Sequence, residues 1–140
     1  MTKTEAIRPT TNTQPDVPTT GRVTGAVAHI LRLEGAIAVI VSMLAYQALE
    51  ESWWVFALLL LVPDLSMLGY LANRKMGALF YNLAHTYLTP SLLALAGFAL
   101  KENALYGLAL IWVAHIGVDR VLGYGLKYQT AFGNTHLSTI

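Results

Sequence analysis

The long stretches without charge constrain this chain most strongly. No Asp, Glu, Lys or Arg occurs in residues 35–49, 76–100 or 103–118, and residues 52–73 hold only Asp64. A membrane-spanning helix needs about 20 mostly apolar residues, and four such windows fit the sequence, roughly residues 27–49, 53–72, 76–100 and 104–122. A water-soluble four-helix bundle would need a charged face on each helix, which the second and third windows lack. The sequence therefore predicts an integral membrane protein.

Short polar joints separate the four windows at residues 50–52, 73–75 and 101–103. Short joints place successive spans antiparallel to each other. We therefore expect an all-α fold, a four-helix transmembrane bundle with up-down topology over residues 27–140 that ends in a short C-terminal cytoplasmic tail. Residues 1–26 differ, because they carry eight Thr and three of the five Pro. Low hydrophobicity with Thr and Pro predicts a disordered N-terminal tail.

The basic residues predict the orientation in the membrane. Of the nine Lys and Arg residues, only Lys101 falls on the side of the bundle opposite the termini, beside Glu50, Glu51 and Glu102. Because Lys and Arg gather on the cytoplasmic side, we expect both termini in the cytoplasm. A net charge of +1 argues against a basic face that binds nucleic acid. The expected partner is the lipid bilayer.

Ionisable residues inside the spans carry the question of function, because they are costly in a membrane and mark functional sites by default. Chemistry based on cysteine is excluded, since the chain has no Cys. At 1.5 Å per residue, the inner ionisable groups lie about 5–13 Å from the cytoplasmic ends of their windows. They therefore share one slab of the bundle. The groups at this depth are Glu34, Asp64, His85, His115 and Asp119.

Residue spacing predicts that these side chains share an inner face. Asn82, His85, Thr86 and Thr89 follow one another at i, i+3, i+4 and i+7, which is one helical stripe. His115 and Asp119 are four residues apart, so their side chains can converge. Pro63 and Pro90 each free a backbone carbonyl within a span.

Two His and two Asp can form a metal site, because imidazole and carboxylate suit zinc or another first-row divalent metal. The predicted ligands are Asp64, His85, His115 and Asp119. A catalytic metal lowers the pKa of its bound water and generates a hydroxide nucleophile. In this interpretation Asn82 or Arg120 orients the substrate.

Two other interpretations fit the same residues. Polar side chains also join transmembrane helices by hydrogen bonds, with salt bridges from Arg120 to Asp119 and from Arg32 to Glu34. Alternatively, the protein is a small transporter or proton relay, which would be a homodimer because four helices leave little room for a pathway. Stoichiometric bound metal would favour the hydrolase, and proton-coupled flux would favour the transporter.

His136, near the chain end, is either a solvated tail residue or a cap over the cluster.

Four motifs occur in order along the chain: Pro63-Asp64-Leu65-Ser66-Met67-Leu68-Gly69-Tyr70, Asn82-Leu83-Ala84-His85-Thr86-Tyr87, His115-Ile116-Gly117-Val118-Asp119-Arg120 running into residues 122–128, and Thr135-His136-Leu137. Together they resemble a bacterial membrane family known as domain of unknown function 4260, over about residues 30–138. The resemblance implies a small multi-pass protein of the bacterial inner membrane and implies no established activity.

A weaker similarity runs to inner-membrane proteins that are assigned by motif as metal-dependent hydrolases. Those proteins carry a Pro-Asp-Leu-Asp segment, a Thr-His-Ser segment and a late helix with His-x-x-x-Asp. Here Ser66 stands in place of the second Asp, His85-Thr86 echoes the second segment, and His115 and Asp119 match the third. The leading interpretation is thus an uncharacterised membrane protein with a His/Asp cluster that acts as a metal-dependent hydrolase.

Overall fold

The chain folds into helices, as the computed structural model shows for residues 23–128 and 135–137. The elements are α1 (Gly25–Ala48), α2 (Trp53–Leu59), the 3₁₀ helix η1 (Val62–Leu71), α3 (Arg74–Ala84), α4 (Leu88–Leu100) and α5 (Asn103–Leu122). The described residues contain no strand, only an isolated bridge between Lys127 and Thr135. The all-α prediction is confirmed. Most of the tail predicted to be disordered, residues 1–22, lies outside the described residues.

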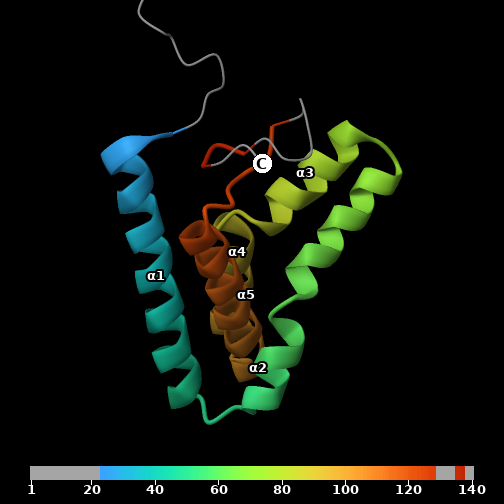
Figure 1. Cartoon of the computed structure of the whole chain (residues 1–140). Coiled ribbons are helices and arrows are strands. Elements are labelled where there is room, and N and C mark those ends of the chain that lie inside the picture. The colour runs from blue at the N-terminus through green and yellow to red at the C-terminus, as the bar shows by residue number, and fades with distance from the viewer. Residues whose placement is uncertain (1–22, 129–134, 138–140) are drawn as a thin grey trace, which may run out of the picture.

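The helices agree with the four apolar windows, with two interruptions. Three helical stretches, Gly25–Ala48, Trp53–Leu71 and Asn103–Leu122, are long and apolar enough to cross a membrane. The third window is not one straight helix, because α3 and α4 meet at a bend of 46°. The structure therefore has three candidate spans, or four if α3 and α4 form one broken span. Figure 1 shows the chain running down, up, down and up through these elements.

Helix α5 organises the packing, because it contacts α1 and α4 and touches α2, while α3 packs mainly against η1. The contact between α1 and α5 is close because glycines face each other there. A Cβ on Gly117 would lie only 2.7 Å from the carbonyl oxygen of Gly35. Small residues allow helix backbones to approach in this way in membranes. Further down, Tyr46, Phe56, Ile111 and Ala114 form a small buried core.

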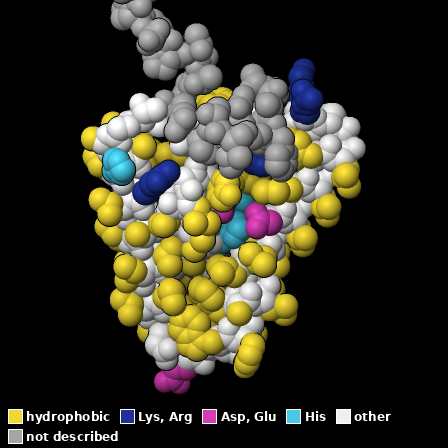
Figure 2. All heavy atoms as spheres, in the orientation of Figure 1, with side chains coloured by type: hydrophobic (Ala, Val, Ile, Leu, Met, Phe, Trp, Pro, Cys, Tyr) yellow, Lys and Arg dark blue, Asp and Glu magenta, His cyan; other side chains and the backbone are white. Residues whose placement is uncertain are grey.

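The outer surface is apolar. Large hydrophobic side chains along every element are exposed, among them Leu44, Leu71 and Phe98, and Figure 2 shows hydrophobic atoms over most of the visible face. A protein folded in water buries most such side chains in its core. The length and apolar exterior of these helices thus indicate a membrane protein.

Candidate metal centre

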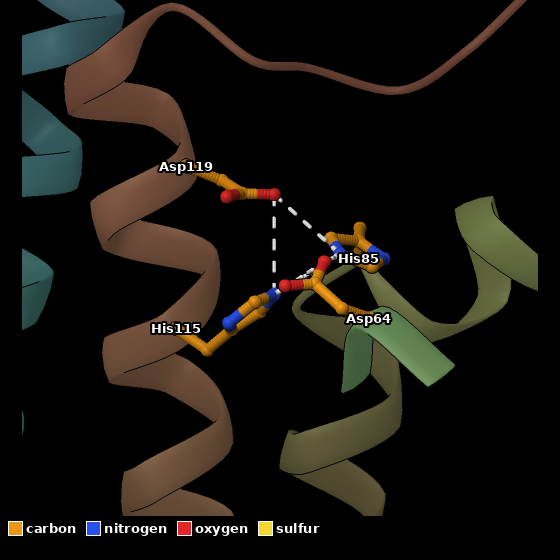
Figure 3. A group of neighbouring side chains, drawn as sticks. All are labelled: Asp64, His85, His115 and Asp119. Carbon is orange, nitrogen blue, oxygen red and sulfur yellow. Dashed lines mark hydrogen bonds and ion pairs between the residues drawn. The ribbon is translucent and has the colours of Figure 1, made fainter. Parts of the chain in front are cut away.

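Three elements bring four ionisable side chains to one place inside the bundle. Asp64 comes from the first turn of η1, His85 caps the C-terminus of α3, and His115 and Asp119 lie one turn apart on α5. Figure 3 shows the four side chains pointing toward one another. One ligand atom from each residue lies within 4.8 Å of every other. The residues predicted as metal ligands are therefore the ones that the fold brings together, and metal binding itself stays a prediction.

The distances within this cluster fall in a narrow range. The Nε2 atom of His85 lies 3.4 Å from Asp64 Oδ1 and 3.5 Å from Asp119 Oδ2. The Nε2 atom of His115 lies 3.6 Å from Asp64 Oδ1 and 3.9 Å from Asp119 Oδ2, and 3.1 Å from Nε2 of His85. Four ligands held about 2.0–2.1 Å from a tetrahedral ion stand about 3.3 Å apart. The donor atoms are thus spaced much as a zinc site requires.

Asp64 owes its position to the proline that precedes it. Pro63 cannot donate a backbone hydrogen bond, so the α-helical pattern of α2 cannot continue through it. The chain tightens into η1, and the backbone N–H of Asp64 donates instead to the carbonyl of Leu61, at 3.2 Å. The predicted interruption at Pro63 is thus present, and it places Asp64 in the first turn of η1.

His85 stands where the third span breaks. Pro90 lacks the N–H that a continuous helix would offer to the carbonyl of Thr86, and its ring would clash there, so a new helix starts at Leu88. The single stripe predicted through Asn82, His85, Thr86 and Thr89 is therefore wrong, because the bend separates Thr89 from the others.

The carbonyl groups released at this break find other partners, as backbone groups at membrane depth require. The hydroxyl of Thr89 donates to the carbonyl of Leu83, and the indole of Trp112 donates to the carbonyl of Ala84, at 2.6 Å. The break is thus a defined feature of the fold that fixes the end of α3, and with it the position of His85.

Tyr81 fixes both the tautomer of His85 and the position of Asp119. The ring atom Nδ1 of His85 lies 2.8 Å from the backbone carbonyl of Tyr81. A carbonyl only accepts hydrogen bonds, so Nδ1 carries the proton and Nε2 presents its lone pair to the cluster. The two rings stack at 3.7 Å, and the Tyr81 hydroxyl donates to Asp119 Oδ2, at 3.1 Å. Sequence reasoning missed Tyr81, although its spacing of four residues from His85 predicts that the two side chains are in contact.

The cluster is closed on the histidine side and open at Asp64. The exposed fractions of the side chains are 3% for His85, 5% for His115, 17% for Asp119 and 39% for Asp64. Figure 2 shows acidic and histidine side chains in a gap between hydrophobic ones. Two carboxylates this close repel each other, and a cation between them relieves that repulsion. A small ion or molecule would reach the cluster past Asp64.

The two residues predicted to orient a substrate have other contacts. Both ends of the Asn82 amide bind the backbone of Lys127, whose carbonyl accepts from Nδ2 at 2.9 Å and whose N–H donates to Oδ1 at 2.7 Å. Asn82 thus anchors the segment after α5. Arg120 lies over the ring of Tyr87, 4.8 Å from its centroid. The expected salt bridges of Arg120 with Asp119 and of Arg32 with Glu34 are not found among the described residues, and the carboxylate of Asp119 instead faces the two cluster histidines.

The segment after α5 returns over the cluster. Gly123 ends the helix with φ of 91°, and the N–H of Tyr124 donates back to the carbonyl of Asp119 at 2.7 Å, the pattern of a glycine C-cap. Lys127 follows, with its ammonium 4.3 Å from the ring centroid of Tyr81. Burial lowers the pKa of this lysine, and the carboxylates of Asp119 and Asp64 partly oppose the shift.

His136 is not a solvated tail residue, because it is hydrogen-bonded to the segment that follows α5. Its Nδ1 accepts from the N–H of Leu126 at 2.8 Å, and its own N–H donates to the carbonyl of Leu126 at 3.1 Å. The carbonyl of His136 accepts from the N–H of Val23 at 2.8 Å, which ties the start of α1 to the end of the described chain. Burial, together with the charge of Arg120, lowers the pKa of His136.

Comparison with known proteins gives a family and no function. The family model described as Domain of unknown function (DUF4260) matches residues 28–140. Neither the curated proteins nor the solved structures contain a match to this chain.

Proposed function

The chain belongs to the DUF4260 family, and from the geometry of its cluster we propose that it is a metal-dependent hydrolase of the membrane. Asp64, His85, His115 and Asp119 would hold one divalent metal such as zinc. The observation that carries this proposal is the convergence of two imidazole nitrogens and two carboxylates, all within 4.8 Å, from three separate elements. That donor set suits zinc and other first-row metals.

The contacts behind the ligands support the metal more than a simple hydrogen-bond network. Metal-binding histidines almost always donate their other ring N–H to a carbonyl or carboxylate, as His85 does to Tyr81. A ligating carboxylate is held in the same way, as Asp119 is by the Tyr81 hydroxyl. These second contacts orient the lone pair of His85 and one oxygen of Asp119 toward the common centre.

In a hydrolase, the cluster residues would have different roles: some would bind the metal and one would accept a proton. When bound, a divalent metal would act as a Lewis acid and would lower the pKa of a water that enters as an additional ligand at the open side of the cluster, beside Asp64. The two histidines are buried and Asp119 is half-buried and held by Tyr81, so these three residues would hold the metal. Asp64 lies at the open side and has a second carboxylate oxygen, so it is the group placed to accept a proton from water beside the substrate. Tyr81 orients the cluster and touches no substrate.

The direct test is the metal content of the detergent-purified protein. We expect stoichiometric zinc or another divalent metal in the wild-type chain and its loss in His85→Ala and His115→Ala. The control is His29→Ala, which removes an exposed histidine outside the cluster and should leave the metal in place. A wild-type protein that binds no divalent metal, even after titration with zinc, would contradict the proposal.

One observation supports the alternative of a proton relay. The two Nε2 atoms lie at hydrogen-bond distance, 3.1 Å, and both face the carboxylates, so a proton can pass between rings and acids. A relay predicts proton flux in metal-free proteoliposomes that is lost in Asp64→Asn. Metal-dependent hydrolysis of ester or phosphate-ester substrates without such flux favours the hydrolase.

We place the protein in the bacterial inner membrane with both termini in the cytoplasm. The distribution of Lys and Arg supports this orientation. In Figure 2 the visible Lys and Arg lie toward the end of the molecule where the described chain begins and ends, and acidic side chains lie at the opposite tip. The hydrogen bond from Val23 to His136 supports an even number of crossings.

A further inference from the structure

An apolar cavity lies beside the cluster, between α2, η1, the end of α3, α4 and α5, and none of the four cluster side chains lines it. It has a volume of about 300 Å³, within the range of pockets that take small ligands. Its walls are almost entirely apolar, and the lining residues with a polar side-chain group are Ser66 and Trp112. The lining side chains include Leu59, Val62, Pro63, Ser66, Leu108 and Trp112.

Residues that are close in sequence to the proposed metal ligands line the cavity. Pro63 precedes Asp64, Ala84 precedes His85, and Trp112 lies three residues before His115 on α5, and all three line the cavity. A second hollow, on the η1 and α3 side, shares Ser66, Ala84 and Trp112 with the first. The two adjoining hollows share these three side chains as a common wall, and we refer to them together as the apolar groove.

The open side of the cluster faces apolar surroundings. Asp64 is the most exposed of the four ligands, at 39%. Its neighbours Val62 and Leu65 are exposed hydrophobic residues, at 46% and 61%. A ligand that arrives past Asp64 therefore crosses apolar surface at membrane depth, which favours molecules that dissolve in lipid.

Ser66 indicates that the occupant carries a polar atom as well. Its hydroxyl is buried and makes no hydrogen bond within the described part of the chain. Buried polar groups are nearly always paired, so such an exception calls for an explanation. If the Ser66 side chain turned toward the cavity that it lines, an ester carbonyl at the head of a hydrocarbon chain would give this hydroxyl an acceptor, while the hydrocarbon would contact the apolar walls.

From these four observations we infer that the groove takes one acyl chain of a membrane phospholipid, with the lipid head group at Asp64 and the two histidines. The inference rests on the proposed function, because a lipid in the groove is a substrate only if the protein is a hydrolase. Ester-containing lipids would then be the substrate class. Chain binding itself does not need the metal, and it can be measured separately.

The test uses Trp112 as a reporter inside the groove. The chain has three Trp, so Trp53→Phe with Trp54→Phe leaves Trp112 alone. Phosphatidylcholine with bromine atoms on one acyl chain is titrated into the detergent-solubilised protein in the presence of a chelator. We expect saturable quenching of Trp112 fluorescence. Ser66→Phe, which fills the groove, should weaken the apparent affinity about tenfold, the size of effect that overpacking produces.

The matched control is Ser91→Phe. Ser91 lines another apolar cavity, of about 430 Å³, between α1, α4 and α5, so the same substitution there should leave the quenching unchanged. Leu108→Phe narrows the groove from α5 and should act like Ser66→Phe, which guards against a folding defect in one variant. Quenching that does not saturate, or that is equal in Ser66→Phe and Ser91→Phe, would overturn the inference.

The quenching and metal-content experiments together separate the lipid site from the metal centre. Saturable quenching in a protein that never binds metal would leave the lipid site standing and remove the hydrolase. Stoichiometric metal without saturable quenching would leave the metal centre standing and remove the phospholipid as its substrate.

Discussion

Tyr81 supports the cluster with two different groups. Its backbone carbonyl accepts from His85 and its hydroxyl donates to Asp119. The residue is also almost fully buried, at 1% exposure. At the residue scale, the site depends on this one side chain as much as on the ligands.

Removal of the Tyr81 hydroxyl should weaken metal binding without loss of the fold. We expect Tyr81→Phe to lower zinc affinity about 10–100-fold, as the loss of such outer contacts typically does. Competition with a zinc chelator measures the zinc affinity of each variant. The control Tyr106→Phe removes a hydroxyl at the far end of α5 and should bind zinc like the wild type. Equal affinity in both variants would show that Tyr81 does not position the ligands.

His136 should make the docked C-terminal segment sensitive to pH. Its pKa in the folded protein is lowered by burial, so the unfolded state binds the proton more readily. Stability is then full above the unfolded pKa of about 6.5 and falls as the pH drops below it. Protonation of Nδ1 also breaks the hydrogen bond from Leu126, at a cost of about 1 kcal/mol.

The measurement is the thermal midpoint at neutral and at mildly acidic pH. The cluster histidines contribute to both samples, so the wild type is compared with His136→Asn, whose side-chain oxygen still accepts a hydrogen bond but does not titrate. The wild type should lose more stability on acidification than the variant. Equal losses would mean that His136 plays no part in the pH response.

At the scale of elements, the close crossing of α1 and α5 holds the span that carries His115 and Asp119. Gly117→Ala should destabilise the protein by about 1–3 kcal/mol, because the new Cβ would meet the Gly35 carbonyl. Gly107→Ala on the same helix is the control. A Cβ there has no neighbour closer than 3.5 Å, and alanine favours helix. A thermal midpoint for Gly117→Ala at or above that of Gly107→Ala would contradict this view of the crossing.

The elements also show what the sequence could predict. Uncharged windows predicted α1, the Trp53–Leu71 stretch and α5 nearly to the residue, because lipid requires long apolar helices. Spacing of four residues predicted the convergence of His115 and Asp119. Pro90 predicted a break in the third window, but not a bend that separates α3 from α4, since a local pattern does not reveal that Thr89 and Trp112 bind the released carbonyls. The contact of Asn82 with Lys127 was missed for the same reason, because the turn at Gly123 brings distant segments together.

At the scale of the whole molecule, the chain enters and leaves the bundle at one end (Figure 1). We expect a fluorescent protein fused after Ile140 to fold in the cytoplasm, and alkaline phosphatase at the same place to stay inactive. Alkaline phosphatase fused after Lys101, in the joint between α4 and α5, should be active. Activity after Ile140 would overturn the orientation and the four crossings together.

The central claim is that two histidines and two aspartates bind one metal. X-ray absorption at the zinc edge of the purified, zinc-loaded protein tests it most directly. We expect four nitrogen or oxygen neighbours at about 2.0–2.1 Å, with the scattering signature of two imidazole rings, and no such shell in His115→Ala, which should lose the metal. A zinc shell without imidazole, or one that is identical in wild type and His115→Ala, would contradict it.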